Sequence, residues 1–232
     1  MRSKRVIITG ATGMVGGCAL RMCLENSVVA RVTVIGRRTV GIQHPRLHEL
    51  FHEDFMDFAA IAAAFIGQDA AFYCLGAYTG AVPDETFRRI TVDYTLAFAS
   101  ELYRQSPRAA FCFLSGQGAD PAERSRVAFA RYKGMAENGL LAVGFPRVHI
   151  FRPGYIYPVT PRREPNLMYA ASRMLYPVLR HIYPNIGIPS EDLAAAIVHA
   201  GLHGTAVHDT PILENRDIRA MVDGCLPGAV RT

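Results

Sequence analysis

The amino-acid sequence predicts an α/β fold in which helices cover both faces of a doubly wound parallel sheet. Short apolar runs alternate with longer segments of helical period. A glycine-rich turn follows the first apolar run, and 50% of the 232 residues are hydrophobic. A chain of this length and apolar content can bury one substantial core. We therefore expect a single domain over residues 1–232, in which residues 155–189 form a small C-terminal segment on the substrate side.

The first half of the chain predicts four strands and two helices. Apolar runs place the strands at residues 6–9, 31–36, 47–52 and 70–75. Residues 13–25 carry an apolar face at helical spacing, which predicts a helix directly after the glycine turn. A longer helix is expected over residues 84–104, because large apolar side chains recur there at helical spacing: Phe87, Ile90, Tyr94, Phe98 and Leu102.

The second half begins with a strand at residues 109–114 that ends beside Ser115. The next helix is expected to start with Asp120 as its cap, since Pro121 and Glu123 complete a capping pattern, and to run to residue 138. Residues 147–152 predict the sixth strand. A helix is expected around residues 166–181, and a late helix has Ser190 as its predicted cap.

The glycine turn predicts a dinucleotide-binding Rossmann fold. Gly10, Gly13 and Gly16 lie between the first strand and the first helix, where phosphates approach the backbone closely and the turn needs unusual dihedral angles. The N–H groups that begin the helix favour a pyrophosphate. The alternative is an ordinary tight turn of three glycines.

The end of the second strand favours NADP(H) over NAD(H). NAD sites commonly place a carboxylate there, whereas this chain has Gly36 followed by Arg37 and Arg38. A guanidinium forms forked hydrogen bonds with a phosphate. The alternative is that both arginines are solvated surface residues. Asp54, after the third strand, is expected to accept a hydrogen bond from adenine, or otherwise to cap its own loop.

These motifs resemble the atypical and extended branches of the short-chain dehydrogenase/reductase superfamily, and more narrowly the Tat-interacting-protein and NmrA-like groups. The resemblance covers residues 1 to about 157 and rests on Thr9-Gly10-x-x-Gly13-x-x-Gly16, Gly36-Arg37-Arg38, Asp54-Phe55, Leu75-Gly76, Ser115 and Arg152-Pro153-Gly154. It implies that the pyrophosphate is wrapped by Gly10, Thr12, Gly13, Met14 and Val15. It also implies that Arg37 and Arg38 hold a 2′-phosphate, that Leu75 and Gly76 pass the adenosine ribose, and that Pro153 and Gly154 lie near the nicotinamide.

Active members of that superfamily use a serine, and a tyrosine four residues before a lysine on one helix. The lysine lowers the pKa of the phenol and binds the nicotinamide ribose. Ser115 and Lys133 fit this pattern, but Phe129 occupies the tyrosine position and has no proton to give. Tyr132 is the first substitute considered, and Tyr155 or Tyr157 is the second; each has an alternative role in packing.

Three functions follow from these residues. An NADP(H)-dependent oxidoreductase with a small carbonyl or enone substrate is favoured. The alternatives are an NADPH-binding regulator or sensor without chemistry, which Phe129 favours, and an isomerase or epimerase that uses bound cofactor. A small-molecule substrate is the expected partner; a homodimer is one alternative for the oligomeric state.

Composition argues against several other classes. The net charge of +5 comes from scattered basic residues rather than a continuous stripe, so we expect no nucleic-acid binding. No apolar stretch approaches the ~20 residues of a membrane span, and no signal peptide is expected. The histidines and the five cysteines lack metal-ligand spacing, so no metal site is predicted. An odd number of cysteines without a signal indicates a reducing compartment, and we expect a cytoplasmic protein.

Overall fold

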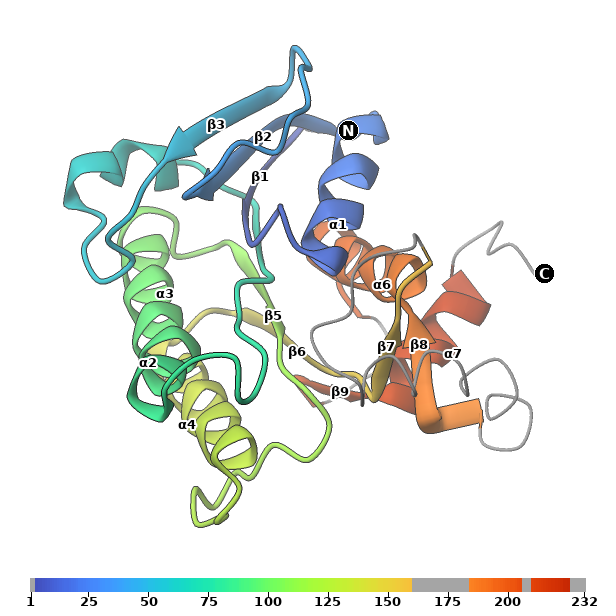
Figure 1. Ribbon diagram of the computed structural model, residues 1–232. Coiled ribbons are helices and arrows are strands. Elements are labelled where there is room, and N and C mark those ends of the chain that lie inside the picture. The colour runs from blue at the N-terminus through green and yellow to red at the C-terminus, as the bar shows by residue number, and fades with distance from the viewer. Residues whose placement is uncertain (1–2, 160–183, 206–209, 226–232) are drawn as a thin grey trace.

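The computed structural model describes residues 3–159, 184–205 and 210–225, and it confirms the α/β fold (Figure 1). Its main sheet has seven strands, all parallel, in the order β3-β2-β1-β4-β5-β6-β9. The strands are β1 (Lys4–Thr9), β2 (Val29–Gly36), β3 (Leu47–Phe51), β4 (Ala70–Tyr73), β5 (Ala110–Leu114), β6 (Arg147–Arg152) and β9 (Ile212–Glu214). The strand order reverses between β1 and β4, and ligands of such sheets bind at the carboxyl ends of the strands beside this reversal.

Helices cover both faces of this sheet (Figure 1). One face is covered by α1 (Met14–Glu25), α6 (Ser190–His203) and α7 (Asn215–Cys225). The other face is covered by α3 (Tyr94–Gln105), α4 (Ala128–Val143) and the 3₁₀ helix η1 (Ala59–Phe65). A π turn, η2 (Arg89–Asp93), joins α3 to the short α2 (Asp84–Arg88), so the helix predicted over residues 84–104 forms with one irregular turn.

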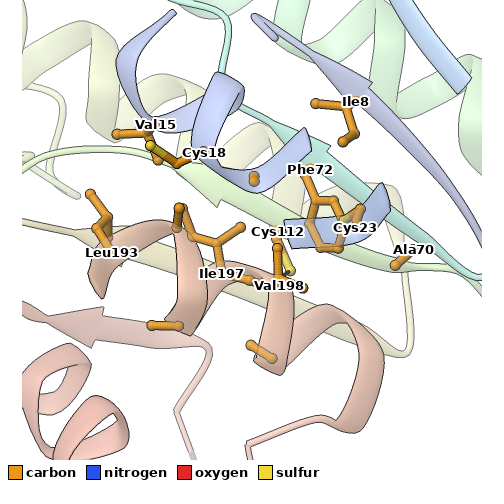
Figure 2. Close-up of a cluster of buried hydrophobic side chains, with 14 of the residues drawn as sticks. Ile8, Val15, Cys18, Cys23, Ala70, Phe72, Cys112, Leu193, Ile197 and Val198 are labelled. Carbon is orange, nitrogen blue, oxygen red and sulfur yellow. Dashed lines mark hydrogen bonds between the residues drawn. The ribbon is translucent and has the colours of Figure 1, made fainter. Parts of the chain in front are cut away.

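The core has two layers because successive strand residues point to opposite faces of the sheet. Ile8 and Phe72 pack in the layer under α1 and α6, whereas their neighbours Ile7 and Tyr73 pack in the layer under α3 and α4. Strands buried on both faces are continuously apolar, and these apolar runs are what made the strands predictable from the sequence. Figure 2 shows the first layer, in which side chains of α1 and α6 meet over the sheet: Val15, Cys18, Cys23, Leu193, Ile197 and Val198.

The six predicted strands all form, with small changes at their ends. The strand at residues 147–152 is confirmed to the residue, whereas β4 ends at Tyr73 rather than at residue 75. The seventh strand, β9, and helix α7 were not predicted. β9 has only three residues, which is too short to show a period.

The predicted start of the helix after β5 is wrong. Asp120 does not cap a helix; its carboxylate accepts hydrogen bonds from the backbone N–H groups of Ala122, Arg124 and Ser125 and thereby holds a turn. Aspartate often stabilises turns in this way. α4 consequently begins at Ala128, and it continues past the predicted end to Gly144, whose left-handed φ of 98° terminates it.

The segment on the substrate side is described only at its two ends. β7 (Tyr155–Tyr157) pairs in parallel with β8 (Gly187–Pro189), which follows the 3₁₀ turn η3 (Pro184–Ile186). The helix predicted at residues 166–181 lies outside the described residues. α6 begins as expected near Ser190, but Pro189 is the cap residue, and the Ser190 hydroxyl instead accepts a hydrogen bond from the Val159 N–H at 3.4 Å.

Candidate active site

A cleft of about 490 Å³ opens at the carboxyl ends of β1, β4, β5 and β6. The glycine turn and the start of α1 form one wall, and α4 forms another. The cleft is lined by Gly13, Met14, Val15, Gly16, Cys74, Leu75, Gly76, Ala77, Tyr78, Thr79, Leu114, Ser115, Gly116, Gln117, Phe129, Lys133, Pro153, Gly154, Tyr155, Ile156 and Pro158. Many of the residues proposed from sequence therefore meet in one cleft: Gly13, Met14, Val15, Gly16, Leu75, Gly76, Ser115, Lys133, Pro153, Gly154 and the alternative Tyr155.

The glycine turn requires glycine at positions 10 and 16, and a side chain at position 13 would be tightly placed. Gly10 has a φ of +72°, and a Cβ there would lie 2.4 Å from the Cys74 carbonyl oxygen. A Cβ on Gly16 would lie 2.3 Å from the Gly10 carbonyl oxygen, and a Cβ on Gly13 would lie 3.0 Å from it. The turn thus folds tightly against β4, with the N-terminus of α1 directed into the cleft.

The end of β4 passes directly beside this turn. Leu75 and Gly76 line the cleft as predicted, and the loop beyond them adds Tyr78 and Thr79. Cys74 is half-buried and lines the cleft as well. Its surroundings raise the pKa of the thiol to about 12, chiefly through desolvation, so the thiol is protonated and behaves as an apolar surface.

Lys133 is held on the floor of the cleft. Its Nζ donates a hydrogen bond to the Leu114 carbonyl at 2.9 Å and lies 4.8 Å from the centre of the Phe113 ring. Burial lowers its pKa to about 8, because desolvation outweighs the opposing charge of Glu137 one turn away. An amine with this pKa exchanges protons near neutral pH.

Ser115 does not direct its hydroxyl proton into the cleft. Its Oγ donates a hydrogen bond to Glu137 Oε1, and Arg152 pairs with the same carboxylate, its Nε lying 3.1 Å from Oε1 and 3.2 Å from Oε2. Arg152 continues the chain to Glu214, whose Oε1 lies 3.1 Å from Nη1. A carboxylate has only acceptor atoms, so the Ser115 hydroxyl proton is used by Glu137 and only the lone pairs of Oγ are left to accept a further hydrogen bond.

Glu137 is the main site residue that the sequence reasoning missed. It is only 1% exposed although it is charged, and such groups are rarely buried without a partner. The available signal was its spacing, because Lys133 and Glu137 are four residues apart and therefore share one face of α4. Its partner Arg152 lies on β6, and no sequence pattern indicated that pairing.

Phe129 occupies the cleft where the expected tyrosine would stand. Its ring lies over Gly116, so that a Cβ on that glycine would be 2.5 Å from Cζ of the ring. The glycine at position 116 therefore makes room for the Phe129 ring, and this wall of the cleft carries no hydroxyl at position 129.

Tyr132, predicted as a catalytic residue, does not line the cleft. It is 5% exposed and its hydroxyl donates a hydrogen bond to Asp84 Oδ2 at 2.6 Å, at the start of α2. Its ring packs against Phe87. The position three residues after Phe129 is rotated by about 60° around an ideal helix, and this rotation directs the side chain toward α2. The second substitute, Tyr155, lines the cleft, whereas Tyr157 is not part of its lining.

Three residues predicted to bind the adenosine half, Arg37, Arg38 and Asp54, lie outside the lining of this cleft, whereas Leu75 and Gly76 belong to it. Arg37 and Arg38 are exposed at the end of β2, and neither forms an ion pair with a described residue. Asp54 is also exposed, and its Oδ1 accepts a hydrogen bond from the Met56 N–H at 2.9 Å, which is the loop-capping alternative. Phe55 is buried in the core, and Thr12 is exposed beside the glycine turn.

Pro153 and Gly154 close the cleft opposite the glycine turn. The Gln117 N–H donates to the Pro153 carbonyl at 2.9 Å, and the Gly154 N–H donates to Asn215 Oδ1 at 3.1 Å. A Cβ on Gly154 would lie 2.5 Å from the Ile186 carbonyl oxygen. This glycine thus lets the two ends of the substrate-side segment approach each other beside the cleft.

Comparison with known proteins agrees with this geometry. A family model described as the NAD dependent epimerase/dehydratase family matches residues 6–127. Protein HTATIP2 of Rattus norvegicus is 33% identical over 158 residues, which cover 67% of this chain and 64% of that protein, a little under two thirds of its length. The mitochondrial protein fmp52 of Aspergillus clavatus is 29% identical over 206 residues, covering 85% of this chain and 86% of that protein.

Solved structures show the same fold. A short chain dehydrogenase family protein from Francisella tularensis superposes with a TM-score of 0.66 at 13% identity, covering 91% of this chain and 96% of that one.

None of the helices in the described part of the chain has the length and hydrophobicity needed to cross a membrane. The cellular location stays a prediction, because the name of the Aspergillus relative carries the word mitochondrial.

Proposed function

The chain belongs to the NAD dependent epimerase/dehydratase family, and on this premise we propose that it is an NADP(H)-dependent oxidoreductase of the short-chain dehydrogenase/reductase type acting on a small carbonyl or enone. The observation that carries the proposal is the cleft itself, in which the glycine turn faces Lys133 and Ser115. A bound nicotinamide would supply or accept a hydride there.

The glycine turn fits a pyrophosphate because side chains are sterically excluded from it. A Cβ at Gly10 or Gly16 would overlap backbone atoms, and the Gly13 N–H donates to the Gly10 carbonyl at 2.9 Å, so the turn is tight and carries no side chain at these glycines. The start of α1 carries no acidic residue in its first turn, and its N–H groups and dipole favour an anion. Gly13 is exposed at the helix cap, where these N–H groups begin.

The preference for NADP(H) over NAD(H) rests on Arg37 and Arg38. In the register of the sheet Thr9 lies beside Ile35, so Gly36 lies next to Gly10 and the arginines follow at the same edge. Both are exposed, and no carboxylate among the described residues pairs with them. Two such guanidinium groups favour a phosphate on the adenosine ribose.

Lys133 carries the proton chemistry in this proposal. Its ammonium uses one hydrogen for the Leu114 carbonyl, which leaves two donors for a ribose hydroxyl and the substrate oxygen. With a pKa of about 8, it can hold a proton beside a substrate oxygen that gains negative charge and can release that proton. Tyr155 is the alternative acid, since it lines the same cleft.

A second function, an NADPH-binding regulator without turnover, is favoured by one observation. Phe129 places an apolar ring on the wall where the family pattern requires a phenol. In that case the cleft would bind NADPH without turnover, and the residues around the cleft would only enclose the bound cofactor.

A titration followed by turnover assays separates the two functions. The purified protein is titrated with NADPH and NADH, and the absorbance of NADPH is then followed with a panel of aldehydes, ketones and quinones. Turnover of any panel member that is lost in Lys133→Met supports the oxidoreductase. Binding of NADPH without turnover across the panel supports the regulator, and binding of neither nucleotide contradicts both.

A further inference from the structure

The loop after β2 is held in place by a single carboxylate from the neighbouring strand. Glu49 lies on β3 beside Val34 of β2. Its Oε1 accepts a hydrogen bond from the Val40 N–H at 2.7 Å, and its Oε2 accepts one from the Thr39 hydroxyl at 3.1 Å. Both carboxylate oxygens are therefore used to fix the two residues that directly follow Arg37 and Arg38.

Further contacts make this loop a defined structure. The Gly41 N–H donates to Thr39 Oγ1 at 3.0 Å, so the threonine hydroxyl is both donor and acceptor. Val40 and Ile42 pack against the core layer under α1. The loop is thus anchored on its inner side, while Arg37 and Arg38 stay exposed on its outer side.

We propose that Glu49 is a positioning residue for cofactor selectivity: its carboxylate fixes the loop that presents Arg37 and Arg38 to the 2′-phosphate. This inference rests on the proposed NADP(H) preference. A long side chain loses rotamer freedom when it binds, and a pre-formed backbone lowers the additional cost of ordering the loop. Glu49 acts through the arginines, because its own negative charge would repel a phosphate.

The two effects of the carboxylate have opposite signs, and this makes the inference testable. If Glu49 mattered only as a charge, removing it would strengthen the binding of a phosphate. If it positions the loop, removing it weakens that binding. Glu49→Ala removes both the charge and the acceptors, whereas Glu49→Gln removes the charge and keeps an amide oxygen for the Val40 N–H.

The experiment compares 2′,5′-ADP with 5′-AMP, which lacks the 2′-phosphate, by calorimetric titration of the full chain. We expect Glu49→Ala to weaken 2′,5′-ADP binding roughly tenfold, as the loss of hydrogen bonds to a charged group predicts, and to leave 5′-AMP binding unchanged. Glu49→Gln should lose much less. Glu53→Ala is the matched control, because Glu53 is an exposed carboxylate after the same strand and should have no effect.

A double-mutant comparison shows whether Glu49 acts through the arginines. In an Arg37→Ala/Arg38→Ala background, Glu49→Ala should cause no further loss of 2′,5′-ADP binding. Three results in Glu49→Ala would overturn the inference: an equal loss of binding for both nucleotides, no loss, or tighter binding of 2′,5′-ADP. None of them would contradict the proposed NADP(H) preference, provided that the wild-type protein prefers 2′,5′-ADP. A wild-type protein without preference for 2′,5′-ADP would overturn the inference together with the proposed NADP(H) selectivity.

Discussion

The glycine turn and the α4 wall face each other across one cleft, but the first consists of backbone and the second of side chains. On the turn, a Cβ at Gly10 or Gly16 would overlap backbone atoms, and Gly13 and the start of α1 line the cleft. On α4, the residues at positions 129, 133 and 137 form one helical stripe directed at the cleft and the strand ends behind it. In the proposed function the turn binds the phosphates of the cofactor, whereas the stripe decides whether chemistry follows.

In the proposed function, cofactor binding and reactivity therefore depend on different walls of the cleft. The turn is complete: its three glycines and its helix start are all in place. The α4 stripe departs from the serine, tyrosine and lysine pattern at one position, where Phe129 replaces the tyrosine. The stripe also carries Glu137, which accepts the hydrogen bond of the Ser115 hydroxyl. Changes on either wall should therefore give different readouts.

The largest effect is expected for Gly16→Ala. The added Cβ would lie 2.3 Å from the Gly10 carbonyl oxygen, so the turn must open and its N–H groups must move. We expect NADPH binding to weaken on the order of a hundredfold, measured by fluorescence titration. Gly224→Ala in α7 is the control, because its Cβ would meet nothing within 4 Å and should leave binding unchanged. Retained affinity in Gly16→Ala would contradict the pyrophosphate role of the turn.

The next largest effect is expected for Phe129→Tyr, which restores a phenol to the α4 stripe. Lys133 lies one turn later and can lower the pKa of that phenol. A positioned general acid contributes about 10²-fold or more, and we expect a gain of that order in the turnover of a carbonyl substrate. Phe129→Leu, which adds no proton donor, should show no gain. Equal rates in both variants would show that the stripe is not otherwise ready for chemistry.

Lys133→Met should weaken function and strengthen the fold. The pKa of Lys133 falls from 10.5 to about 8 on folding. Burial of this amine therefore lowers the free energy of unfolding by its full amount below pH 8, and the destabilisation disappears as the pH rises to 10.5. At pH 7 the variant should gain about 1–3 kcal/mol in the free energy of unfolding, less the contribution of the hydrogen bond to Leu114. Denaturant unfolding at pH 7 and pH 10 measures the difference in the free energy of unfolding between the variant and the wild type, which should be smaller at pH 10.

A smaller effect is expected for Tyr132→Phe, which tests the boundary of the α4 stripe. The variant loses the hydrogen bond to Asp84 and should lose about 1 kcal/mol in the free energy of unfolding. NADPH affinity and turnover should not change, since Tyr132 lies outside the cleft lining. Loss of turnover without loss of stability would restore the catalytic role that the sequence predicted for Tyr132.

Sequence patterns were sufficient where one local segment carries all the information. The glycine turn, the six predicted strands and α1 depend on neighbouring residues and on a clear period, and each of them forms. Patterns failed where one local motif fits two structures and where distant segments cooperate. Asp120 satisfied every rule for a helix cap, yet its carboxylate holds a turn by accepting hydrogen bonds from the N–H groups of Ala122, Arg124 and Ser125. β9 carries no period of its own and is a strand because it pairs with β6.

Local patterns in the chain are enough to predict a parallel sheet with a glycine turn after its first strand, because burial on both faces and the steric needs of glycine are local properties. The partners of Tyr132, Ser115 and Glu137 depend on the folded chain, because a side chain's direction is set by what packs against it. Tyr132 turns to Asp84 and Ser115 turns to Glu137, since buried polar groups bind the partners that the folded chain brings within reach.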